Sequence, residues 1–232
     1  MKAEQGESYM TRKRFFSLLC TGAIVLAGCS KAPAEETPES PEPAETQETE
    51  PVQEQVFSIG NIDGTVYTND TLHIRIELPQ GWVYASEEDL VKLNQTVIDS
   101  FENEELKAAM EDGAAVMGVY ATSPDGTQQI NIMFQEMPMS VYTPEMIINA
   151  SIPEVRSQLE SQGMTVVSIT KEPIVFLGED SHCMRIEGSL NNISLYETQV
   201  YAKEGNYLAV ITCSSVVNDT TMDLVGMITS TK

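Results

Sequence analysis

Residues 67–82 read YTNDTLHIRIELPQGW, and this stretch contains the first clear strand pattern of the chain. Leucine and isoleucine occupy the even positions from 72 to 78, while histidine, arginine and glutamate occupy the odd positions between them. A period of two residues predicts a β-strand with one apolar and one polar face. Pro79-Gln80-Gly81 ends this strand, and Trp82-Val83-Tyr84 continues in an extended form.

Two helices are expected next. Ser86 precedes three acidic residues at 87–89, which suits a helix N-terminus because the helix dipole favours anions there. Hydrophobic residues then recur at helical spacing over 90–101, and a second, shorter helix is expected around residues 106–110.

A β-hairpin is predicted over 114–122 and 128–136, joined by the turn Ser123-Pro124-Asp125-Gly126. The second strand alternates, with Ile130, Ile132 and Phe134 on one face and Asn131, Met133 and Gln135 on the other. Thr143-Pro144-Glu145 then begins a helix, which we expect Pro153 to kink or restart, with Ser151 as a new cap.

Four extended runs follow, over 164–170, 182–188, 193–202 and 207–213. Turns at 191–192 and 204–206 predict that the last three form an antiparallel meander, and a final helix is expected over 219–228. Antiparallel hairpins interrupted by helices indicate an α+β domain, with helices packed on a twisted sheet.

The opening Tyr67-Thr68-Asn69-Asp70, followed by the strand and Pro79-x-Gly81-Trp82, resembles the start of PsbP-like domains. Residues 176–179 and the hairpin 201–212 are similar to the closing strands of that superfamily. The resemblance covers nearly all of residues 56–232. It implies a central antiparallel sheet flanked by helices, an α/β/α arrangement, and a function in protein docking, not catalysis.

The N-terminal residues have the features of an export signal. Basic residues at 12–14 precede an apolar stretch over 15–25, and Leu26-Ala27-Gly28-Cys29 follows directly. This pattern resembles the lipobox of bacterial lipoproteins, which implies a signal peptide over 1–28 and a diacylglyceryl group on Cys29. Two acyl chains suffice for stable membrane attachment. Either Met1 or Met10 is the start.

Residues 29–55 are expected to form a disordered tether after the lipidated cysteine. The tether has eight glutamates and almost no large apolar side chain, so it cannot bury enough surface to fold. The remainder, 56–232, is expected to be one globular domain.

The net charge of −22, from 35 acidic and 13 basic residues, argues against binding to nucleic acid. No apolar run reaches the roughly 18 residues that a membrane-spanning helix needs. We therefore expect the protein at the extracytoplasmic face of a cell membrane, held by its lipid. The acidic tether favours a Gram-positive envelope.

Few residues suggest a catalytic or metal-binding site. His73 lies on the polar face of its strand, and His182 and Cys183 are neighbours in a strand, so their side chains point to opposite faces. The sequence contains no motif of a serine hydrolase, zinc peptidase or nucleotide enzyme. Its acidic clusters lack the spacing of a calcium loop, and Met137-Pro138-Met139 is interpreted as core filling. No enzyme activity, metal or cofactor is expected.

Cys183 and Cys213 are candidates for a disulfide in an exported protein. The predicted meander places Cys183 opposite Gln199 and Cys213 opposite Tyr196, with one strand between them. That separation, about 9–10 Å, exceeds the ~7 Å that a disulfide spans. Two buried thiols are favoured, while a different strand order would allow the disulfide.

We therefore expect a non-enzymatic lipoprotein that docks onto an envelope protein. The sheet face around Tyr67, Asn69, Trp82 and Tyr84 is the candidate docking surface, because aromatic residues are enriched at binding hot spots. Core packing is the alternative for Trp82. Two other functions remain open: a lipoprotein that binds a small ligand or solute, and, third, a hydrolase acting on an envelope substrate.

Overall fold

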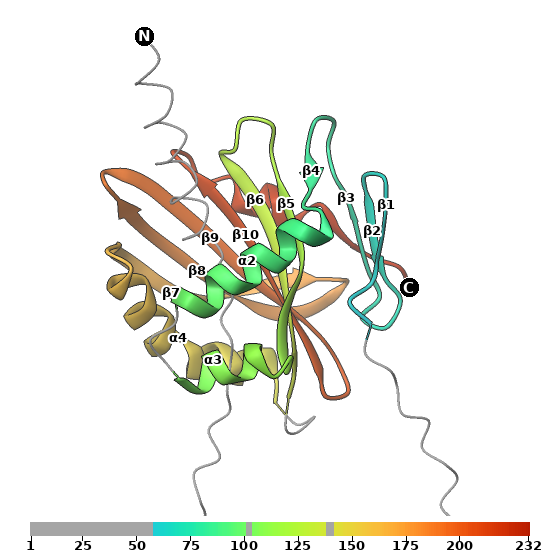
Figure 1. Cartoon of the computed structure of the whole chain (residues 1–232), viewed down its shortest axis with the longest axis horizontal. Coiled ribbons are helices and arrows are strands. Elements are labelled where there is room, and N and C mark those ends of the chain that lie inside the picture. Colours follow the sequence, from blue (N-terminus) through green and yellow to red (C-terminus); the bar gives the residue numbers. More distant parts are fainter. Residues whose placement is uncertain (1–57, 101–103, 138–141) are drawn as a thin grey trace, which may run out of the picture.

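The computed structural model describes residues 58–100, 104–137 and 142–232. The predictions for the signal peptide, Cys29 and the tether concern residues outside these ranges. The described part is an α+β fold that is built mostly from antiparallel strands (Figure 1).

The largest element is a seven-stranded antiparallel sheet with the order β4-β5-β6-β10-β9-β8-β7. Its strands are β4 (Val83–Tyr84), β5 (Ala115–Thr122), β6 (Gln128–Glu136), β7 (Thr165–Phe176), β8 (Glu179–Leu190), β9 (Ile193–Glu204) and β10 (Tyr207–Val216). The predicted hairpin and meander are both confirmed, although β7 and β8 extend well beyond the predicted runs.

A smaller, four-stranded sheet has the order β1-β2-β3-β11. Its strands are β1 (Asn61–Asp63), β2 (Val66–Asn69), β3 (Ile74–Glu77) and β11 (Ile228–Ser230). The alternating stretch over residues 72–78 thus contains β3, whose Ile74 and Ile76 are fully buried.

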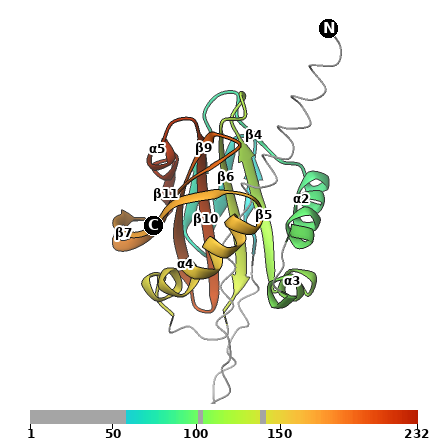
Figure 2. The same ribbon diagram turned by 90° about the vertical axis from the view of Figure 1, so that its left-hand side faces the viewer.

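Three helices cover one face of the large sheet: α2 (Glu87–Ser100), α3 (Glu104–Glu111) and α4 (Pro144–Ser161). Figure 2 shows α2 and α3 together on one side of this face and α4 on the other. The helices and the sheet enclose the helix-side core, which includes Val97, Ile98, Met110, Ile147, Leu159, Met133, Met184 and Val210.

The opposite face of the large sheet is covered by the small sheet and by α5 (Thr221–Val225). Between them lies the second core, which includes Tyr67, Ile74, Ile76, Trp82, Ile132, Phe134, Val200, Ile211 and Leu224. The α/β/α arrangement is therefore corrected: helices form the outer layer on one face, and a second sheet forms most of it on the other.

Two local predictions also change. The final helix was expected over 219–228, but α5 ends at Val225 and Ile228–Ser230 pairs with β3 instead. The helix α4 continues through Pro153 without restarting. Ser151 is not a cap, because its hydroxyl donates to the Ile147 carbonyl at 2.8 Å. The helix start predicted at Thr143-Pro144-Glu145 is confirmed, and Thr143 is its N-cap, since its hydroxyl accepts from the Met146 amide.

Candidate functional site

The four residues proposed for docking lie mainly inside the fold. Tyr67, Asn69 and Trp82 are 1%, 0% and 7% exposed, and Tyr84 is half-buried. Tyr67 donates to the Ile59 carbonyl at 2.9 Å. Burial raises the pKa of Tyr67, and it raises the pKa of Tyr84 to about 12.

Asn69 organises the backbone around it. Its Nδ2 donates to the Ser58 carbonyl at 2.8 Å, and its Oδ1 accepts from the Leu72 amide at 2.9 Å. Tyr67 and Asn69 thus hold the first described residues against β2 and shape the turn before β3. These two residues and Trp82 are buried in this conformation and pack inside the fold. Docking near Tyr84 stays a prediction.

The two cysteines in the described residues form no disulfide with each other. Cys183 and Cys213 are both free and buried, and β9 lies between their strands. The register differs slightly from the prediction, because Cys213 pairs with Thr198 and Met184, not Cys183, pairs with Gln199. Burial raises the pKa of both thiols, and Glu172 adds to this effect at Cys183, so neither is suited to act as a thiolate nucleophile.

A cavity of about 280 Å³ lies where the β7–β8 turn, the end of β9, the turn before β3 and the C-terminal residues meet. We call it the charged hollow. Its lining includes charged or titratable side chains of both signs: His73, Glu179, Asp180, Lys203, Glu204 and Lys232. A hollow with both signs of charge can bind a partner that also carries both.

A second hollow of about 330 Å³ lies beside it and shares Asp180 and Ser181. We call it the apolar hollow, because Pro173, Ile174 and Val175 of β7 form part of its lining. Val175 is 69% exposed. An apolar side chain and a neighbouring charged group of one partner could therefore occupy the two hollows together.

The backbone is strained at the charged hollow. His73 and Leu177 both line it, and their φ angles are 54° and 53°, in the left-handed region that non-glycine residues rarely adopt. Each such residue costs on the order of 1–3 kcal/mol and persists where the surroundings enforce it, which happens often at functional sites.

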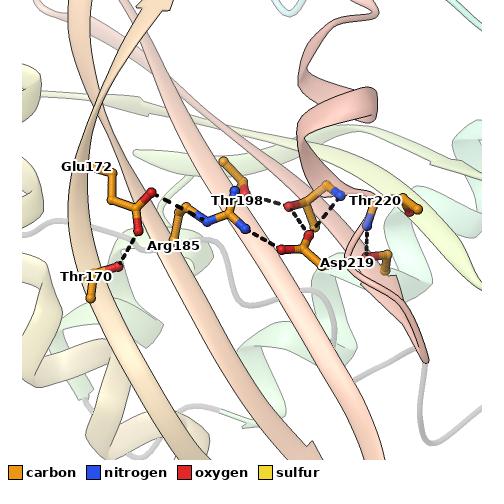
Figure 3. A network of polar contacts seen from close by, with 8 residues as sticks. Thr170, Glu172, Arg185, Thr198, Asp219 and Thr220 are labelled. Carbon is orange, nitrogen blue, oxygen red and sulfur yellow. Dashed lines mark hydrogen bonds and ion pairs between the residues drawn. The ribbon is translucent and has the colours of Figure 1, made fainter.

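The β7–β8 hairpin, which contributes residues to both hollows, takes part in the polar network in Figure 3. Arg185 on β8 lies 3.8 Å from Glu172 on β7 and also forms an ion pair with Asp219. Asp219 in turn accepts from the Thr221 hydroxyl at 2.7 Å, and that hydroxyl lies 2.7 Å from the Thr198 hydroxyl. The network connects β7, β8, β9 and the start of α5.

Burial works against the charge of Asp219, but the Thr221 hydrogen bonds and Arg185 outweigh it and lower the pKa of its carboxyl. Asp219 is therefore negatively charged at neutral pH and can pair with Arg185.

Within the described ranges, no three histidine, cysteine, aspartate or glutamate side chains lie close enough to hold a metal ion. Likewise, none of the helices described there is long and apolar enough to span a membrane.

Sequence reasoning missed both hollows. It treated His73 as an exposed strand residue, whereas His73 lies in the turn ahead of β3. The hollow combines residues near positions 73, 180, 203 and 232, which only the tertiary structure brings together. The sequence signal that could have pointed to the charged hollow is the Leu177-Gly178 turn. Residues 176–179 were noted only for their similarity to PsbP-like domains.

No protein-family model matches the chain, and no curated protein matches it. Among solved structures, it is similar to the solution structure of cyanobacterial PsbP (CyanoP) from Synechocystis sp. PCC 6803. The identity is 10%, the match covers 74% of this chain and 98% of that chain, and the TM-score is 0.44.

Proposed function

We propose that this chain is a lipoprotein, anchored through Cys29 at the extracytoplasmic face of a cell membrane. In this proposal, its folded domain docks onto another envelope protein through the charged and apolar hollows. The anchor rests on the basic, apolar and Leu-Ala-Gly-Cys pattern of residues 12–29. The docking function rests on one observation, which is the pair of adjoining hollows that share Asp180 and Ser181.

Docking hot spots combine a filled pocket with neighbouring polar contacts. The apolar hollow can receive an aliphatic or aromatic side chain, and the charged hollow can pair with ionic groups beside it. The Arg185 network fixes the hairpin that carries them, so less entropy is lost on binding than with a mobile loop.

Photo-crosslinking on intact cells tests this proposal. A photoreactive residue replaces Val175 in one variant and Val91 of α2 in the other, and each of these valines is 69% exposed. We expect a discrete crosslinked protein with the first variant and none with the second. Equal crosslinking at both positions would contradict docking at the hollows.

A charge substitution gives an independent measurement on the purified pair. Val175→Asp should weaken binding to the captured protein at least about tenfold, because it places a carboxylate in the apolar hollow. Val91→Asp is the matched control and should leave binding unchanged. Both substitutions are on the surface and should change the free energy of unfolding by less than about 0.5 kcal/mol.

A further inference from the structure

The strand β7 forms one edge of the large sheet (Figure 1). Among the described residues, it pairs with β8 alone, in an antiparallel register that is regular from Ile169 to Phe176. With 12 residues, β7 is long for an edge strand, and the free side of such a strand can pair with another chain. We call the free side of β7 the β7 edge.

Pro173 shows which residues direct their backbone groups toward the β7 edge. In an antiparallel pair of strands, every second residue exchanges two hydrogen bonds with the residue opposite. Pro173 has no N–H, so its pair with His182 is of the other kind, in which the backbone groups point away from the neighbouring strand. This orientation recurs every two residues. The N–H and C=O groups of Lys171 and Val175 therefore face the β7 edge, together with the Pro173 carbonyl.

The side chains of the same stretch adjoin the apolar hollow. Pro173 and Val175 both line that hollow, and Val175 is 69% exposed. Directly opposite side chains on neighbouring strands lie about 5 Å apart. A strand that is added at the β7 edge would therefore place one of its own side chains beside Val175, so one extended segment can contact both the edge and the hollow.

The helix α4 leaves this part of β7 accessible. Because α4 ends at Ser161 and β7 begins at Thr165, the helix runs back beside the first half of the strand. Its first turn carries Glu145, which forms an ion pair with Lys171. The β7–β8 hairpin beyond Lys171 consequently extends past the start of α4, and the apolar hollow lies on this part of the hairpin.

Two features of the edge indicate what can bind there. Glu179 and Asp180 are exposed at the turn after β7, and their carboxylates attract basic groups. Pro173 removes one backbone donor from the edge, and proline at an edge opposes open-ended pairing of strands. The edge therefore suits a short, basic segment.

We propose that the β7 edge binds an extended, basic segment of the partner protein as an added antiparallel strand, with an apolar side chain of that segment in the apolar hollow. This inference rests on the docking function proposed above and names what the partner presents. Backbone hydrogen bonds to Lys171, Pro173 and Val175 supply affinity, while the hollow and Asp180 select the side chains. The antiparallel direction continues the pattern of the sheet and gives the stronger pairing.

Other kinds of ligand would use the edge less well. A helix bonds its own N–H and C=O groups internally, so it cannot pair with the backbone of β7. The backbone groups from Lys171 to Val175 extend over about 13 Å, which is longer than a small solute can bridge. An extended peptide matches both the length and the spacing of these groups.

Hydrogen exchange at single-residue resolution, on the mature, lipidated chain in nanodiscs, tests the proposal. The probe is a synthetic peptide of alternating valine and threonine with a lysine at each end. In the chain alone, the amides of Lys171 and Val175 should exchange fast, while those of Glu172 and Ile174, which face β8, should exchange slowly. The peptide should slow exchange at Lys171 and Val175 at least about tenfold.

A copy of the peptide with methylated backbone nitrogens is the control, because it keeps the side chains but cannot donate hydrogen bonds. It should leave the exchange at Lys171 and Val175 unchanged. Equal slowing by both peptides, or slowing by neither, would overturn strand addition. Slow exchange of the two amides in the chain alone would also overturn it, since another part of the chain or a second copy would already occupy the edge.

Two substitutions at one position separate the backbone from the side chain. Val175→Pro removes an N–H that faces the edge, and it should weaken binding of the peptide at least about tenfold. Val175→Thr keeps this N–H and the shape of the side chain, so it should have a smaller effect. Slow exchange at Glu172 and Ile174 in both variants verifies that the hairpin is intact. An equal or larger effect of Val175→Thr would contradict strand addition.

The docking function and strand addition can fail separately. Slowing of the Lys171 and Val175 amides by the peptide supports strand addition, whatever the photo-crosslinking at Val175 shows. A protein that crosslinks at Val175 but leaves these two amides in fast exchange when it is bound would support docking and overturn strand addition.

Discussion

At the scale of single residues, Asp219 determines how one part of the fold responds to acid. Its folded-state pKa lies below its ordinary value of 3.8 because the Thr221 hydrogen bonds and Arg185 favour the charged form over the opposing effect of burial. A lowered pKa stabilises the folded state above the unfolded-state value, and this contribution is lost as the pH falls through the folded-state pKa.

We predict that Asp219→Asn lowers the free energy of unfolding by about 1 kcal/mol at neutral pH, since it removes an ion pair and weakens hydrogen bonds to a charged group. The difference from the natural chain should shrink as the pH falls from about 5 to about 3. Urea unfolding at a series of pH values measures it. A difference that stays constant over this range would contradict the role of the carboxylate charge.

The two buried thiols lead to a second prediction. Cys183 and Cys213 should react slowly with an alkylating reagent in the folded protein, because burial keeps them protonated and out of reach. Both should react fully in denaturant without any reductant. Peptide mass spectrometry that finds a disulfide between them would show that the strand order is wrong.

Residue types were easier to predict than their surroundings. The sequence pattern singled out the tyrosine and asparagine at 67 and 69 as docking residues, whereas the structure buries both and bonds them to residues 58–59. Exposure depends on what packs against a side chain, and here the covering segments are distant in sequence. Alternation placed Asn131 and Met133 on one face of β6, but it could not show that both side chains are buried there.

At the scale of elements, local signals predicted most of the fold. The β5–β6 hairpin and the β8–β9–β10 meander depend on turns between neighbouring strands, and the sequence shows such turns directly. The pairing that completes the small sheet could not be predicted in this way. Its β3 pairs with β11, which is about 150 residues later in the chain, and loop closure over that distance leaves no local pattern.

Helix α4 contains a proline that local helix preferences disfavour but that the folded protein accommodates. Pro153 lies inside the helix on its exposed side, where it cannot donate a backbone hydrogen bond. We predict that Pro153→Ala raises the free energy of unfolding by about 1–2 kcal/mol, because the restored helical bond outweighs the added entropy of the unfolded chain. Urea unfolding measures the change.

Ser157→Ala is the matched control for this prediction, since Ser157 is also exposed on α4. It should stabilise the protein by only a few tenths of a kcal/mol, the ordinary difference in helix propensity. An effect of Pro153→Ala no larger than the control would mean that the helix already accommodates proline at no cost.

At the scale of the whole molecule, the proposed anchor and the proposed docking hollows form one arrangement. A long acidic segment separates the lipobox cysteine from the first described residue, Ser58. An extended tether of this composition, at about 3.1 Å per residue, would hold the folded domain tens of ångströms from the lipid surface. The two hollows could then bind a partner away from the membrane.

This arrangement depends on lipidation, which a pair of cysteine variants can test. We predict that Cys29→Ala abolishes the incorporation of labelled palmitate and releases the protein from the membrane fraction, because no other stable membrane attachment is expected. Cys20→Ala is the matched control, since Cys20 lies in the apolar stretch before the lipobox and should leave labelling unchanged. Labelling that persists in Cys29→Ala but disappears in Cys20→Ala would show that Cys20 carries the lipid. The tether would then be longer than proposed.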